Sequence, residues 1–94
     1  MTEQLLDVSD LPPPEPLEQC LAALEVLPPG VYLRVLHSRE PYLLYPFLDE
    51  GGFAYVTVTG ERTPLEIFIW RRGDAVAEDA LHRDRRRGQA SAEP

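Results

Sequence analysis

The alternation of hydrophobic and polar residues predicts two elements in the first third of the chain. A short apolar run at residues 4–8 is typical of a strand, and the proline cluster that follows indicates a stiff turn. From Leu17 to Leu27, apolar residues recur at helical spacing, which predicts a helix with one buried face. Pro14 or Pro16 fits the first turn of this helix, where an amide has no intrahelical acceptor.

The rest of the pattern predicts three strands and a second helix. Residues 31–36 alternate as a strand with both faces partly buried. A shorter helix follows, with Ser38 as its N-cap and Pro46 as a kink or an early end. Residues 53–59 and 65–71 then form an antiparallel hairpin.

This order, βαβαββ, predicts an α+β fold: a two-layer α/β sandwich with a mixed four-stranded sheet and both helices on one face. The opposite face of the sheet is then open and carries aromatic side chains. Contiguous apolar surface of this kind marks an interaction site, whereas rings that only pair across strands stabilise the sheet itself. Both interpretations stay open for the four partner-surface candidates, Tyr32, Tyr55, Phe68 and Trp70, of which Tyr55 depends on the register of its strand.

The length of 94 residues fits one domain, which we place at residues 1–73. Residues 74–94 lack aromatic residues and are rich in Ala, Asp, Glu and Arg, so we expect a charged, disordered tail. The run at residues 83–87 is either a solvated charged segment or a local anion-binding patch.

Charge and cysteine content narrow the classes of partner. The net charge of -7 argues against nucleic acid as a partner, because such binding needs clustered Lys and Arg. One cysteine cannot form an internal disulfide, which fits a reducing cytoplasm. The sequence predicts no membrane span, no signal peptide and no cofactor. We expect a cytoplasmic monomer or weak homodimer with an unidentified protein partner.

The densest group of functional side chains begins where the second strand ends. His37 can titrate, Arg39 can hold a carboxylate or phosphate, and Glu40 and Tyr45 complete a candidate ligand site. Ligands of α/β proteins favour this end of a strand. The alternative is a capped helix start in which Arg39 pairs with Glu40 in solvent. A metal site on His37 with Glu40 is a weaker possibility.

Cys20 is the single cysteine, and its position in the pattern decides whether it is a reactive thiol or a core residue. A cysteine of lowered pKa can act as a nucleophile or persulfide carrier. Cys20 instead lies between Leu17 and Leu24 on the apolar stripe of the first predicted helix. That position predicts a small buried core residue.

Three segments carry a family resemblance, namely residues 5–8, 10–17 and 27–30. Together with Tyr45-Pro46-Phe47 and Gly52-Phe53, they resemble the sulfur-carrier family typified by TusA and SirA over roughly residues 4–72. Pro13 stands where that family has its persulfide-bearing cysteine. The chain is more similar to a related bacterial family of unknown function that lacks the cysteine. That family has a His-x-Arg-Glu-Pro-x-x-Leu-Tyr-Pro segment, here residues 37–46. The resemblance implies the same sandwich and no activity.

These observations favour a non-enzymatic interaction or regulatory module on a sulfur-carrier-like fold. The alternative is a small-ligand or metal-binding domain that uses His37, Arg39, Glu40 and Tyr45 and is linked to sulfur or redox metabolism. An unusual sulfur carrier that uses Cys20 is a third hypothesis.

Overall fold

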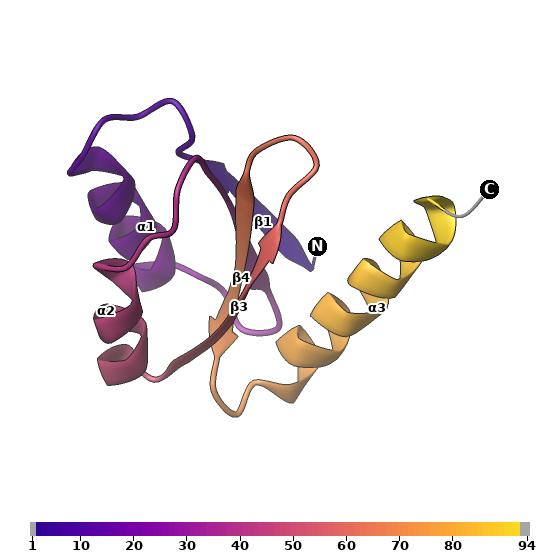
Figure 1. Ribbon diagram of the computed structural model, residues 1–94. Coiled ribbons are helices and arrows are strands. Elements are labelled where there is room, and N and C mark those ends of the chain that lie inside the picture. The colour runs from indigo at the N-terminus through magenta and orange to yellow at the C-terminus, as the bar shows by residue number, and fades with distance from the viewer. Residues whose placement is uncertain (1, 93–94) are drawn as a thin grey trace.

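The computed structural model describes the backbone of residues 2–92 and the side chains of residues 2–87. Six elements follow the predicted order βαβαββ, and a third helix comes after them (Figure 1). In chain order they are β1 (Glu3–Asp7), α1 (Glu15–Glu25), β2 (Tyr32–His37), α2 (Leu44–Gly51), β3 (Phe53–Thr59), β4 (Leu65–Arg71) and α3 (Ala75–Ala92). No helix within residues 2–92 is long and apolar enough to span a bilayer.

The four strands form one mixed sheet in the order β1-β2-β4-β3. β1 and β2 are parallel, whereas β4 is antiparallel to both of its neighbours, β2 and β3. The predicted hairpin of β3 and β4 is therefore confirmed. β2 and β4 occupy the centre and are buried on both faces, which explains why their sequences are hydrophobic at nearly every position.

Helices α1 and α2 cover one face of the sheet (Figure 1). Val31, Leu33, Val35, Ile67 and Ile69 lie on this face and belong to one buried cluster with Cys20, Leu24, Leu44 and Leu48. α1 carries a proline in its first turn, as predicted. The prediction of Ser38 as the N-cap of the second helix is wrong, because α2 begins only at Leu44. Pro46 is then in the first turn of α2 and interrupts no backbone hydrogen bond.

Helix α3 covers the opposite face of the sheet (Figure 1). Ala77, Ala80 and Leu81 are buried in a cluster with Tyr32, Phe68 and Trp70. The prediction that this face is open is therefore wrong, and so is the prediction of disorder over residues 75–92. Residues 93–94 of the predicted tail lie outside the described residues. Small side chains on α3 let its backbone approach the large rings of the sheet, so the helix buries its face without a strong hydrophobic stripe.

The start of α3 is fixed by one carboxylate. Asp74 Oδ1 accepts a hydrogen bond from the Ala77 amide at 3.1 Å, which caps the helix. Asp74 Oδ2 accepts a second bond, of 2.8 Å, from the amide of Gly30 in the turn before β2. These amides hold the pKa of Asp74 below its ordinary value. The same side chain therefore begins the helix and ties it to the sheet.

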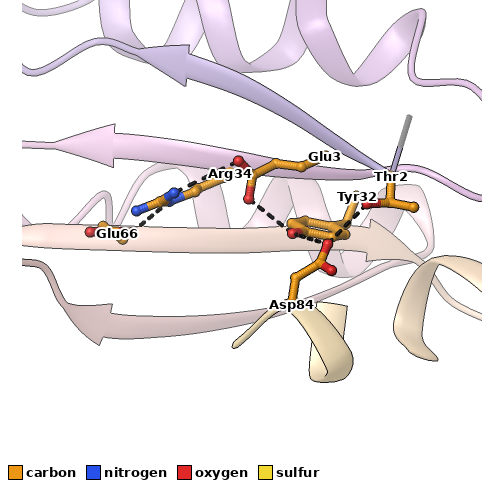
Figure 2. Close-up of polar contacts among 6 residues, drawn as sticks. All are labelled: Thr2, Glu3, Tyr32, Arg34, Glu66 and Asp84. Carbon is orange, nitrogen blue, oxygen red and sulfur yellow. Dashed lines mark hydrogen bonds and ion pairs between the residues drawn. The ribbon is translucent and has the colours of Figure 1, made fainter. Parts of the chain in front are cut away.

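A second carboxylate anchors α3 farther along (Figure 2). Asp84 Oδ2 accepts hydrogen bonds from the hydroxyls of Thr2 and Tyr32, both at 2.9 Å. The Tyr32 hydroxyl also lies 2.9 Å from Glu3 Oε1. Arg34 forms ion pairs with both Glu3 and Glu66, and the pair with Glu66 has a distance of 2.7 Å. β1, β2, β4 and α3 are thus joined by one polar network at the edge of the aromatic cluster (Figure 2).

Candidate functional site

A cleft of about 290 Å³ opens beyond the carboxyl ends of the parallel strands β1 and β2. The proline-rich turn before α1 and the first half of α1 form one side, and the loop between β2 and α2 forms the other. Apolar side chains make up most of the walls. Among them are Pro13, Pro14, Pro16, Leu17, Pro41, Leu43 and Leu44. Prolines hold the shape of such a wall because their backbone is already restricted.

His37 is the last residue of β2 and lines the cleft with only 6% of its surface exposed. Its Nδ1 accepts a hydrogen bond from the Arg39 amide at 3.2 Å. Burial, together with the nearby Arg39 charge, lowers the pKa of His37, so the ring is neutral at pH 7. A neutral imidazole that accepts at Nδ1 carries its proton on Nε2.

The Nε2–H of His37 has no hydrogen-bond partner among the described residues. Among those residues, every fully buried side-chain nitrogen or oxygen has a hydrogen-bond partner. Because Nε2 has none, it is not fully buried and reaches solvent. His37 is one of the residues that line the cleft, so its only donor without a partner belongs to a cleft-lining ring.

Arg39 and Glu40 lie on the loop after β2 and line the same cleft. The Arg39 guanidinium forms no ion pair or side-chain hydrogen bond with another described residue, so the predicted solvent pair of Arg39 with Glu40 is not present. Glu40 Oε2 instead accepts a hydrogen bond from the Tyr45 hydroxyl at 2.9 Å. The cleft therefore presents one unpaired cation and one restrained carboxylate.

Tyr45 supports the site from outside the cleft. Its hydroxyl lies 2.7 Å from Thr57 Oγ1, so Thr57 donates to Tyr45 when Tyr45 donates to Glu40. Its ring stacks on Tyr55 at 4.8 Å with an interplanar angle of 6°. Burial is the main cause that raises the pKa of Tyr45. The structure thus makes Tyr45 a positioning residue for Glu40, whereas the sequence placed it in the ligand site itself.

Cys20 lines the inner part of the cleft but is almost completely buried. Burial raises the pKa of its thiol to about 11. At neutral pH the sulfur therefore carries its proton and is a poor nucleophile. The prediction that Cys20 belongs to the core is confirmed.

The four partner-surface candidates do not form one exposed patch. Tyr32, Phe68 and Trp70 lie beneath α3. Tyr55 pairs with Ile69 and packs with the opposite cluster, under α1 and α2. The large apolar side chains that are exposed beside the cleft are Tyr42 at 72% and Leu43 at 75%. Neither was a candidate from the sequence, because both fell inside the second predicted helix after Ser38, whereas α2 begins only at Leu44 and leaves them on the preceding loop.

The ring orientation of His37 disfavours a metal. A metal bound at Nε2 leaves the proton on Nδ1, which would then face the Arg39 amide, a second donor. Metal-binding histidines instead donate from the second ring nitrogen to an acceptor. The described residues hold no group of three or more His, Cys, Asp or Glu side chains placed to bind a metal ion.

Residues 5–71 match the family described as "Uncharacterized conserved protein (DUF2249)". The chain belongs to this family. The matched residues contain the whole cleft and end at the last residue of β4, before α3 begins. No curated protein and no solved structure shows a significant match.

Proposed function

We propose that this chain is a non-enzymatic binding module that holds a small organic molecule in the cleft between the proline-rich turn and the loop after β2. One observation carries the proposal: His37 is buried, its Nδ1 accepts a backbone amide, its Nε2–H has no partner among the described residues, and it lines an apolar cleft together with an unpaired Arg39. Binding sites for small molecules typically combine apolar walls with a few fixed polar groups.

The state of the polar groups supports binding rather than catalysis. The Cys20 thiol has a raised pKa, which is the opposite of what nucleophilic catalysis needs. The basic nitrogen of His37, Nδ1, is already occupied by a backbone amide. Glu40 is held by Tyr45. These groups are arranged to orient a ligand and to leave it unchanged.

We also propose that the fold is related to the TusA and SirA sulfur carriers and that the protein acts in a bacterial cytoplasm. The order βαβαββ and the proline-rich turn after the first parallel strand support this relation. Pro13, which stands where the resemblance places the carrier cysteine, lines the cleft. In this proposal the carrier position has become part of a binding wall, within a sulfur or redox process.

A second candidate function is contact with a protein partner, including a second copy of the chain, at the mouth of the cleft. The exposure of Tyr42 and Leu43 favours it. Sedimentation equilibrium of the wild type and of Leu43→Ser over a wide concentration range tests self-association. Weaker association of the variant supports the candidate, and identical monomeric behaviour of both proteins contradicts self-association.

A fragment screen of the ¹⁵N-labelled full chain tests the proposed function directly. The screen uses small anionic, cationic and neutral organic molecules and follows the backbone amide signals. We expect at least one class to shift signals of residues 13–20 and 37–44 together, because these segments form the two sides of the cleft. His37→Gln should weaken that binding, whereas His82→Gln, at the exposed second histidine, should not. If no class shifts these signals, the proposal is wrong.

A further inference from the structure

The charges that line the cleft limit the kind of ligand it can accept. Arg39 contributes one positive charge, and the neutral His37 contributes one directed donor. Glu40 contributes a negative charge, which repels anions and disfavours a dianion more strongly than a monoanion. One cation with one neutral donor suits a monoanion, and charge-assisted hydrogen bonds of this kind are the stronger ones.

The start of α1 favours an anion at the same place. Leu17 lines the cleft and lies in the first turn of α1, where amides have no intrahelical acceptor. The neighbouring amides of Glu15 and Glu18 are bonded to Pro12 and Pro14 oxygens, and Pro16 has no N–H. The Leu17 amide is therefore the donor left at the positive end of the helix. This feature acts together with the buried His37, whose free Nε2–H is the second, independent indication of a ligand.

The walls of the cleft determine the rest of the molecule. Proline and leucine side chains offer contacts to carbon atoms and no hydrogen bonds. A volume of about 290 Å³ is at the small end of ligand sites and suits a short aliphatic chain or a single ring. A phosphate dianion suits this cleft poorly, because it would bring a second charge and no apolar surface.

We infer that the ligand is a small organic monocarboxylate, whose carboxylate binds His37 Nε2–H and Arg39 and whose aliphatic or aromatic body lies against the proline walls. This inference rests on the proposed function and specifies its ligand class. It assigns the specificity for charge to Arg39 and the specificity for shape to the prolines and Leu17.

Matched probes test the inference on the ¹⁵N-labelled full chain. Hexanoate and phenylacetate are each compared with their neutral amides, hexanamide and phenylacetamide, and with hexylamine and inorganic phosphate. We expect the carboxylates to bind about tenfold more tightly than the amides, because each amide loses the charge-assisted contact. Arg39→Gln should remove this preference, whereas Arg62→Gln, on the exposed loop between β3 and β4, should retain it.

The possible results separate the inference from the proposed function. Equal binding of carboxylate and amide, or an unchanged preference in Arg39→Gln, overturns the inference. Tighter binding of hexylamine at the cleft signals also overturns the inference, and the proposed function then stands. Tighter binding of inorganic phosphate overturns both. If none of the probes and none of the screened fragments shifts these signals, both the inference and the proposed function fail.

Discussion

Replacing Leu81 with alanine tests whether α3 covers the aromatic face of the sheet. Leu81 is fully buried in the cluster with Phe68 and Trp70. The substitution removes three carbon atoms, or about 2.4 kcal/mol at roughly 0.8 kcal/mol for each buried CH₂ group. Because α3 is an outer layer and can shift toward the sheet, the additional cavity cost should be small. We therefore expect the free energy of unfolding to fall by about 2–3 kcal/mol.

Trp70 makes this change directly measurable. It is the single tryptophan and is 9% exposed beneath α3. Urea denaturation followed by its fluorescence should show a lower midpoint for Leu81→Ala, and acrylamide should quench Trp70 more strongly without denaturant. Val76→Ala is the control, because Val76 is 69% exposed on the same helix and should change stability by less than about 0.5 kcal/mol.

The packing of α3 on the aromatic face is contradicted if Leu81→Ala keeps the wild-type midpoint and the wild-type quenching of Trp70. Such a result would mean that the helix does not bury this face in solution. A lower midpoint with unchanged quenching would show that Leu81 is buried and that α3 stays docked in the native variant, so that only the quenching prediction fails.

Three further predictions concern the polar network, the turns and the support of the cleft. Burial raises the pKa of Asp84, but hydrogen bonds and the Arg83 charge outweigh burial and leave it below the ordinary 3.8. The ionised Asp84 carboxylate therefore stabilises the fold fully above about pH 4, and this stabilisation is lost as pH falls through its lowered pKa in the folded state. In urea denaturation at a series of pH values, Asp84→Asn should therefore lose less of its free energy of unfolding at acid pH than the wild type does. Gly30→Ala and Gly73→Ala both place alanine at positive φ and should each cost about 1–2 kcal/mol in thermal denaturation. Gly30→Ala should cost more, because its new Cβ lies 3.3 Å from a carbon of α3; equal costs would contradict this contact. Tyr45→Phe should lower stability in urea by about 1 kcal/mol through its lost hydrogen bonds, and Tyr42→Phe, at an exposed ring, should not; an unchanged Tyr45→Phe would refute the positioning role.

The pattern of alternate residues placed Tyr32, Phe68 and Trp70 on the face of the sheet away from α1 and α2, and they lie there, but it could not show that this face is covered too. β2 and β4 have large apolar residues on both faces, so either assignment of faces gives a buried side. The position of Tyr55 could not be predicted, because β3 contains apolar or aromatic residues on both faces and only its pairing with Ile69 determines which one Tyr55 joins. A shift of one residue would have reversed it.

Helix α3 could not be predicted because its hydrophobic pattern is weak. Its buried face consists of Ala77, Ala80 and Leu81, which together form a weak hydrophobic stripe, and exposed Val76 makes that stripe harder to recognise. The surface that α3 covers is rich in aromatic rings, so close approach by small residues replaces a large apolar stripe. The carboxylates that anchor α3, Asp74 and Asp84, have partners more than forty positions away in the chain.

The candidate site was predicted in part. His37, Arg39 and Glu40 were selected because they follow a strand end, and the structure brings all three to one cleft. The opposite wall could not be predicted, because Pro13 and Leu17 are explained equally well as parts of a turn and a helix stripe. Only the parallel pairing of β1 with β2 brings these two segments together.

The most direct test of the proposed site at His37 is a long-range ¹H–¹⁵N correlation spectrum of the histidine rings, recorded at neutral pH with and without hexanoate. We expect a neutral His37 with its proton on Nε2, because Nδ1 accepts a hydrogen bond from the Arg39 amide, and a downfield shift of that proton when the carboxylate binds. The exposed His82 should not change. A His37 proton on Nδ1, or a His37 signal that hexanoate and phenylacetate leave unmoved, would contradict a carboxylate site at His37.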